Sequence, residues 1–218
     1  MGWNFNSEKF YLSSNLYYMK YKNQLVLTGS LDDVGTPIRD NSGESYRMGI
    51  ELESAVVLNS EINISGNISF SENKNINYIT NYDGVSVNLG DTDISFSPKF
   101  ISSLQLSYKP SSNVDISLLN KFVGDQYMSN TESDFSKLDS YAVTDLSIRY
   151  KCKETFLFIY VVITAMINNI FDKEYVSNGY YYTYDDTWSN PNAITTIEGS
   201  GYYPQATRNF LLGISFKL

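Results

Sequence analysis

The chain has 218 residues and carries 16 basic against 24 acidic side chains, which gives a net charge of −8 and an isoelectric point near 4.5. A surface that binds nucleic acid needs clustered Lys and Arg, so this balance excludes nucleic acid as an expected partner. The chain has no histidine and a single cysteine, Cys152, so it lacks a disulfide framework, the usual zinc and haem ligands and the commonest general base; we therefore expect neither a cofactor nor enzyme activity.

The composition favours an all-β fold. Aromatic residues make up 15% of the chain, with 19 Tyr, whereas charged residues make up only 18%, below the usual quarter of a soluble domain. Amphipathic rings of this kind suit places where apolar and aqueous surroundings meet. Asn and Ser, which are poor helix formers, are also abundant.

Alternation of apolar and polar residues predicts strands that have one apolar face. The pattern starts clearly in the stretch from Tyr46 to Glu53 and is almost unbroken from Ile62 to Phe70. It returns three more times before the end of the chain, in the segments around 104–108, 114–118 and 142–149. The predicted strands cover residues 8–28, 44–58, 62–78, 93–109, 114–124, 141–150, 155–169 and 208–218.

The links between these strands alternate between long and short. Long links cover residues 29–43, 79–92, 125–140 and 170–207, and short turns cover 59–61, 110–113 and 151–154. Transmembrane barrels have long loops on one side and tight turns on the other, and strands of about 9–11 residues can cross a bilayer when tilted. We therefore expect a transmembrane antiparallel β-barrel.

One strand departs from the alternation. Residues 156–167 read FLFIYVVITAMI and are apolar at nearly every position. A transmembrane helix needs about 20 such residues, so the run is too short for one, and its β-branched and aromatic content favours a strand that is apolar on both faces. Packing of an apolar partner against the inner face and local degeneration of the sequence both remain open as explanations.

In such a barrel the polar faces of the strands would point to the lumen. The predicted lumen-facing residues are Arg47, Glu51, Glu53, Gln105, Asp145 and Arg149. Glu51 and Glu53 share a face, as paired catalytic carboxylates would, but a polar inner face beside Arg47 explains them without catalysis.

The segment from 170 to 207 is the candidate ligand-binding loop. Aromatic rings with hydrogen-bonding neighbours are typical of surfaces that grip a ligand. The equal alternative is a loop whose rings stack on one another. The candidate ligand residues are Tyr180, Tyr181, Tyr182, Tyr184 and Trp188.

Two segments carry a family resemblance. Residues 168–180 (NNIFDKEYVSNGY) and 203–213 (YPQATRNFLLG) resemble the C-terminal end of TonB-dependent outer-membrane receptors, in the form found in Bacteroidetes. Residues 24–29, 33–35, 45–51, 96–99 and 127–131 are similar to the same family, so the resemblance covers nearly the whole chain.

The resemblance implies a 22-stranded barrel plugged by an N-terminal domain, in the Gram-negative outer membrane. Such a receptor imports a ligand such as a metal chelate, vitamin or oligosaccharide with energy passed on by TonB. Residues 1–218 would then be one C-terminal barrel segment of about eight strands without the plug, and no secretory signal opens the chain at Met1 to Asn6.

The last strand also implies a partner besides lipid. In the family it forms part of the signal for the barrel-assembly machinery and usually ends on an aromatic residue, from which Leu218 departs. The residues of this signal would be Phe210, Leu212, Ile214, Phe216 and Leu218.

Two other classes remain as alternatives. A self-contained small barrel of eight strands, with an adhesin or structural role, fits the strand number. A soluble β-sandwich that binds a partner predicts a chain that stays monomeric in water without detergent, whereas we expect aggregation because of a large apolar belt.

Overall fold

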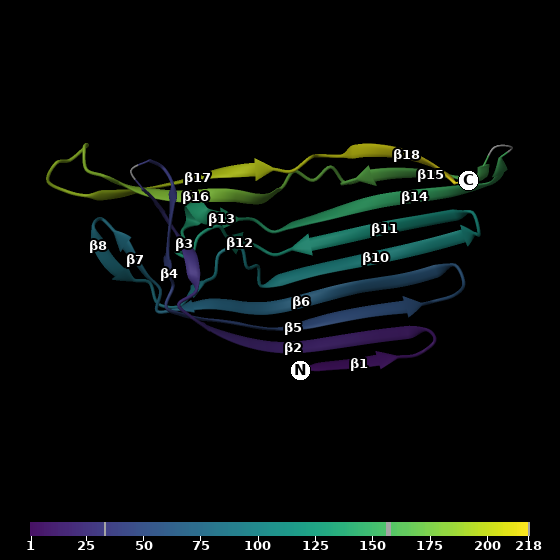
Figure 1. The fold of residues 1–218 in the computed structure, drawn as a ribbon, viewed down its shortest axis with the longest axis horizontal. Coiled ribbons are helices and arrows are strands. Elements are labelled where there is room, and N and C mark those ends of the chain that lie inside the picture. The colour runs from purple at the N-terminus through teal and green to yellow at the C-terminus, as the bar shows by residue number, and fades with distance from the viewer. Residues whose placement is uncertain (33, 156–157, 218) are drawn as a thin grey trace.

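The computed structural model describes residues 1–32, 34–155 and 158–217. Its main feature is one large antiparallel sheet whose strands lie side by side in chain order (Figure 1). The path across the sheet is β1 (Gly2–Asn6), β2 (Phe10–Lys22), β5 (Glu44–Val57), β6 (Ile62–Ile76), β10 (Phe100–Ser111), β11 (Val114–Val123), β14 (Tyr141–Thr155), β15 (Phe158–Asn168) and β18 (Asn209–Lys217). A short tenth strand, β9 (Thr92–Asp93), pairs with the end of β6.

The sheet is open, because β1 and β18 form its two edges and do not pair with each other in the described part of the chain. An eight-stranded barrel requires its first and last strands to pair. The expectation of all-β architecture is confirmed, whereas the self-contained small barrel does not agree with this structure.

Tight polar turns join the strands at one end, which we call the turn end. In the β5–β6 turn, Oδ1 of Asn59 accepts hydrogen bonds from the backbone N–H groups of Glu61 and Ile62, both at 2.8 Å. Adjacent turns are also linked to each other, since the N–H of Lys109 donates to the carbonyl of Glu61. An Asn side chain that satisfies the turn backbone in this way explains why the chain reverses within three residues.

The four long links lie together at the opposite end, which we call the loop end (Figure 1). They are not irregular loops, because each contains paired strands. The pairs are β3 (Leu25–Leu31) with β4 (Pro37–Asn41), β7 (Ile79–Tyr82) with β8 (Val85–Asn88), β12 (Gln126–Tyr127) with β13 (Lys137–Leu138), and β16 (Val176–Asp186) with β17 (Thr195–Pro204). A 3₁₀ turn, η1 (Asp134–Ser136), precedes β13.

The predicted alternation of link lengths is thus confirmed, but several boundaries were wrong. The strand expected over 8–28 ends at Lys22, because Asn23 adopts a left-handed φ of 56° and sends β3 into a separate sheet with β4, β16 and β17. The strand expected over 93–109 is interrupted: Asp93 pairs with β6, the chain then leaves the sheet with a left-handed φ of 50° at Phe96, and it rejoins the sheet at Phe100. The turn expected over 151–154 lies inside β14.

The pairing register sorts the side chains into two faces, since neighbours along a strand point to opposite sides. Apolar rings line one face: Phe100 stacks near Phe70 and Phe122, with centroids 4.7 and 5.5 Å apart. Tyr108 and Tyr150 lie on the same face near the turn end. We call this surface the apolar face and the opposite one the polar face.

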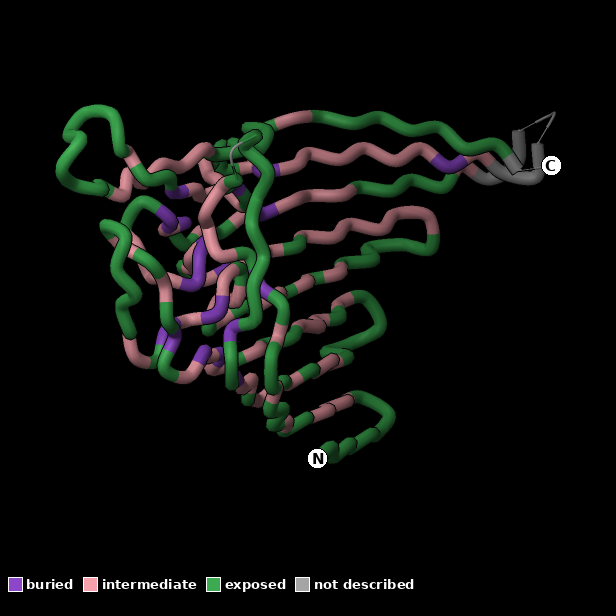
Figure 2. The backbone as a smooth tube through the Cα atoms, turned by 60° about the vertical axis from the view of Figure 1, so that its left-hand side comes forward, coloured by how far each residue is buried: buried purple, intermediate pink, exposed green. Residues whose placement is uncertain are grey.

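Large apolar side chains remain exposed on the apolar face. Leu104 is 54% exposed, Phe70 51% and Leu212 73%. Monomers in water rarely present so extended an apolar surface. Most buried residues gather instead at the loop end, where the hairpins pack on one another (Figure 2).

The apolar run of the sequence falls largely on β15. Residues 156 and 157 lie outside the described residues. Within the strand, the register places Val162 and Met166 on the polar face and Ile163 and Ala165 on the apolar face. Val162 is only 5% exposed, so one of the apolar residues on the polar face is covered by neighbouring groups.

Candidate functional site

The six predicted lumen-facing residues all lie on the polar face. The strand register shows this, because residues paired across neighbouring strands point to the same face: Glu53 lies opposite Asn67, Gln105 opposite Ser65, and Asp145 opposite Leu119. They do not form one cluster, because they are spread over three strands, β5, β10 and β14. The polar face therefore provides a long lining rather than a catalytic centre.

Arg47 on β5 is the best-anchored member of this lining. Its Nη1 donates to Oγ of Ser97 at 2.9 Å and to Oδ1 of Asn73 at 3.3 Å. Ser97 belongs to the segment that leaves β9 and crosses the polar face before β10 begins. This side chain thus fastens a loop-end segment to the wall, beside a hollow of about 470 Å³ that Glu51 and Tyr17 also line.

Three of the other members, Glu51, Gln105 and Asp145, make local contacts. Nδ2 of Asn15 donates to Glu51 at 3.1 Å, and Gln105 donates to Oγ of Ser107 at 3.2 Å. Asp145 accepts from the backbone N–H of Asn169, the residue that follows β15, at 2.8 Å. These contacts stabilise the wall and leave its surface polar.

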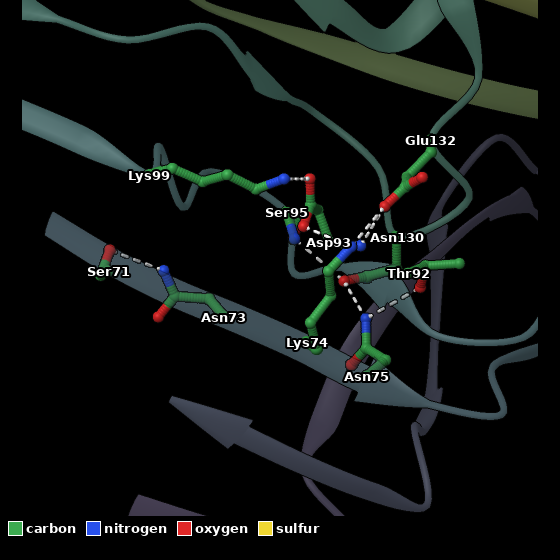
Figure 3. Close-up of polar contacts among 10 residues, drawn as sticks. All are labelled: Ser71, Asn73, Lys74, Asn75, Thr92, Asp93, Ser95, Lys99, Asn130 and Glu132. Atoms are coloured by element: carbon green, nitrogen blue, oxygen red, sulfur yellow. Dashed lines mark hydrogen bonds and ion pairs between the residues drawn. The ribbon is translucent and has the colours of Figure 1, made fainter. Parts of the chain in front are cut away.

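A polar network joins the sheet to the loop end (Figure 3). Nζ of Lys74 on β6 contacts Asp93 at 2.7 Å and Glu132 at 3.2 Å, and Lys99 contacts the other oxygen of Asp93 at 3.0 Å. The Lys74 side chain is only 18% exposed. Partial burial makes such a paired group costly to break, because each charge loses its partner away from water.

Asn130 lies at the centre of this network. Its Oδ1 accepts from Nδ2 of Asn75 and from the backbone N–H of Ser95, and its Nδ2 donates to the carbonyl of Leu27 on β3, at 3.1, 3.0 and 3.2 Å. Asn130 is 1% exposed and Asn75 is fully buried. One amide thus ties three links to the end of β6, which positions the loop-end hairpins on the wall.

The tyrosine-rich segment forms the β16–β17 hairpin. Tyr180 and Tyr182 are stacked on one face of β16, with centroids 6.2 Å apart. Opposite them on β17 stand Gly201 and Gly199, where a Cβ would collide with these rings. The rings therefore pack over glycine backbone, as the stacking alternative expects, while Tyr180 stays 51% exposed; a role in ligand binding stays a prediction.

The other candidate ligand residues differ in exposure. Tyr184 is 43% exposed on the same face, and Trp188, in the connection beyond β16, is 81% exposed. Tyr181 points to the other face, where its hydroxyl donates to Oε1 of Glu198 at 2.5 Å. The hydroxyl of Tyr82, on the β7–β8 hairpin, donates to the same oxygen at 3.0 Å.

Glu198 therefore locks two hairpins together, and we call its contacts with Tyr82 and Tyr181 the Glu198 latch. Burial first, and the bond to Glu198 second, hold the pKa of Tyr181 well above its ordinary value. Next to the latch, Asp83 and Thr196 exchange two hydrogen bonds of 2.8 and 2.7 Å. The β7–β8 and β16–β17 hairpins thus form one unit.

No group of His, Cys, Asp and Glu suited to a metal ion occurs among the described residues. In that part of the chain no helix is long and apolar enough to cross a membrane. A search of curated proteins returned no match. The family model described as TonB dependent receptor-like, beta-barrel, matches residues 1–170.

The chain belongs to the TonB-dependent receptor-like β-barrel family. This family resides in the outer membrane of Gram-negative bacteria. The match extends over most of the chain and starts at its first residue, so it covers the sheet from β1 to β15.

Solved structures of TonB-dependent receptors share this fold. The siderophore receptor PiuA from Acinetobacter baumannii is 20% identical, with a TM-score of 0.66 over 99% of this chain. The copper transporter OprC is 17% identical with a TM-score of 0.70, and the ferric-catecholate import receptor Fiu from E. coli K12 is 16% identical with a TM-score of 0.64. The chain spans 27%, 30% and 26% of these three proteins.

Some of the residues that hold the loop end together escaped the sequence analysis. Glu198 and Tyr82 are 116 positions apart and carry no local pattern, so only the fold brings them together. Asn130, by contrast, lies in the 127–131 segment that resembles the family, so the resemblance marked it without giving its role. Of the predicted assembly-signal residues, Phe210, Leu212, Ile214 and Phe216 lie on the apolar face of β18, and Leu218 lies outside the described residues.

Proposed function

We propose that this chain forms part of the wall and the outer mouth of a receptor that takes up a ligand across the outer membrane with energy from TonB. The observation that carries the proposal is the division of one sheet into an apolar and a polar face, with all four hairpin links at one end. The apolar face would contact lipid, the polar face would line the lumen, and the loop end would face the outside.

The loop end supports a role in ligand capture. Its hairpins are fixed to one another by the Glu198 latch and to the wall through Asn130. Tyr184 and Trp188 nevertheless stay exposed, and aromatic groups on a rigid support bind with little loss of conformational entropy. The solved structures named above are a siderophore receptor, a copper transporter and a ferric-catecholate import receptor. For this chain we propose a metal chelate, a vitamin or an oligosaccharide as the ligand.

Orientation is tested by labelling cysteines in intact cells. In a Cys152→Ser background, a Trp188→Cys variant should react with a membrane-impermeant maleimide added outside, because this position lies at the exposed loop end. A matched Ser112→Cys variant at the turn end should react only after the outer membrane is permeabilised. The reverse pattern, or equal labelling of both, would contradict the proposed orientation.

Uptake is tested by deleting the gene in its native host. We expect the deletion to abolish protonophore-sensitive accumulation of one of three radiolabelled probes: a ferric catecholate, cyanocobalamin or a neutral trisaccharide. Unchanged accumulation of all three would contradict the uptake role. Partners follow from the same proposal: TonB and the ligand act on the intact receptor, while lipid and the barrel-assembly machinery contact the strands.

A further inference from the structure

A polar cavity lies at the loop end, between the β3–β4 hairpin and the segment that runs from the end of β6 through β8. Its volume is about 660 Å³, within the range of pockets that hold a small ligand. The aliphatic residues of its wall are Ile38, Ile76 and Ile79. Most small-molecule pockets are mainly apolar, so this cavity differs from them in its chemistry. We call it the β4–β7 cavity.

The wall of the cavity offers both hydrogen-bond donors and acceptors. Arg39 supplies only donors, Asp40 only acceptors, and the amides of Asn41 and Asn81 supply both. Oδ1 of Asn81 is held in place, because it accepts from Oγ of Ser86 at 2.8 Å. Arg39 has no ion-pair partner among the described residues, so its guanidinium is available to a ligand.

One residue of this wall has unused polar capacity. The hydroxyl of Ser42 is buried without a hydrogen-bond partner, in a residue that is 8% exposed. Buried polar groups normally have partners, and an orphan one calls for a specific explanation. Tyr78 is 4% exposed beside the same cavity, and burial first, with the Asp40 carboxylate next, raises the pKa of its hydroxyl.

The charges of the wall decide between ligand classes. Arg39 and Asp40 are its charged residues, and together they carry no net charge. An anionic chelate would meet Asp40 without a surplus of positive charge to offset its desolvation. A hydroxyl group, in contrast, donates and accepts at once and so matches a wall in which donors and acceptors are interspersed.

We infer that the β4–β7 cavity binds a neutral, hydroxyl-rich ligand of the size of a short oligosaccharide. The inference rests on the proposed function, since it assigns a ligand class and a capture site to the same receptor mouth. The cavity adjoins the small sheet that carries the tyrosines of β16, because its lining residue Ser30 on β3 lies opposite Thr183 of β16, with their hydroxyl groups 3.3 Å apart.

The test measures binding of neutral trisaccharides to the purified chain by isothermal titration calorimetry. The detergent must carry no sugar headgroup, so a zwitterionic amine oxide is used. The probes are maltotriose, cellotriose, xylotriose and laminaritriose, with a ferric catecholate as the anionic comparison. We expect at least one trisaccharide to bind, and the Arg39→Ala variant to bind it about tenfold more weakly, the effect of losing one good hydrogen bond to the ligand.

The control is Arg208→Ala, which removes an arginine of the loop end that contacts Asp172 at 3.7 Å away from the cavity. It should leave the affinity unchanged, and circular dichroism should show the same strand content in all variants. If an arginine variant loses its strand content, the affinity of an Asn81→Ala variant for the trisaccharide is measured instead, because Asn81 lines the opposite side of the cavity from Arg39.

The inference is overturned if none of the four trisaccharides binds, if Arg39→Ala and Arg208→Ala weaken binding equally, or if Arg39→Ala weakens only the catecholate. Protonophore-sensitive uptake of a chelate or vitamin in cells would then leave the uptake role standing. If no trisaccharide binds and the gene deletion also leaves the accumulation of all three probes unchanged, the uptake role and the cavity inference both fail.

Discussion

Replacement of Leu104 by Arg tests the assignment of the apolar face. Leu104 lies on β10, four residues from Phe100 and four from Tyr108, which is about 13 Å along the strand from each aromatic ring. Its side chain is 54% exposed, so the change creates no large cavity. If the apolar face contacts lipid, the substituted guanidinium would lie near the middle of the hydrocarbon layer.

The size of the effect follows from the depth of this position. An arginine on the lipid face of a transmembrane barrel destabilises it by about 2–4 kcal/mol near the bilayer midplane and by about 0–1 kcal/mol near the interfaces. We therefore expect the Leu104→Arg variant to lose about 2–4 kcal/mol in unfolding free energy. That is a decrease of roughly 30-fold to 900-fold in the ratio of folded to unfolded protein.

The assay is urea unfolding of the chain in phospholipid vesicles, followed by the fluorescence of Trp3 and Trp188. Gln105→Arg is the matched control, because the next residue of the same strand points to the polar face. This variant should lose less than about 1 kcal/mol, as substitutions on a solvated surface usually do. Equal losses in the two variants would refute the assignment of the faces.

Three further changes probe the loop end. Lys74→Met leaves two carboxylates without their shared cation and should destabilise the protein by about 2 kcal/mol in urea titrations. Lys20→Met, in an exposed pair, should leave the stability nearly unchanged, and equal effects of the two changes would contradict the role of the network. Glu198→Gln should lower the pKa of Tyr181 in a tyrosinate absorbance titration, because the wild-type hydroxyl stays protonated in the folded state above pH 10. The latch therefore stabilises the fold fully below the pKa of the unfolded state, and this stabilisation is lost as pH rises through the pKa of the folded state. An unchanged titration would argue against the latch. Gly29→Ala places a Cβ 2.9 Å from the Tyr181 ring, in a backbone with a φ of +89°. The β3–β4 hairpin should therefore be destabilised by about 2 kcal/mol and should exchange its amide hydrogens faster. Unchanged protection of these amides from exchange would contradict this packing.

The strands could be predicted because each carries its own signal. Alternation over residues such as Ile62 to Phe70 depends only on nearest neighbours, and the register confirms the faces that it implies. The last strand, from Phe210 to Phe216, lies beyond residue 170, where the family match ends, but the fold shared with the solved receptors covers 99% of the chain.

The loop end could not be predicted in the same detail, because its structure depends on contacts between distant residues. Tyr181 appeared as one of five equivalent aromatic candidates, yet in β16 it points to the opposite face from Tyr180 and Tyr182, where its partner is the distant Glu198. The strands inside the long links were missed for a related reason. In β16 the rings of Tyr180 to Tyr182 are consecutive, and Gly199 and Gly201 stand opposite them on β17, so neither strand shows an alternation of apolar and polar residues.

The most direct test of the central claim is a nitroxide scan along β10. Single cysteines at positions 101 to 108, in a Cys152→Ser background, are spin-labelled in outer membranes, and their collision rates with oxygen and with a water-soluble nickel chelate are measured. The account predicts a period of two residues, with position 104 accessible to oxygen in lipid and position 105 accessible to the nickel chelate in water. A scan without this period, or with the two positions exchanged, would contradict the membrane-spanning wall.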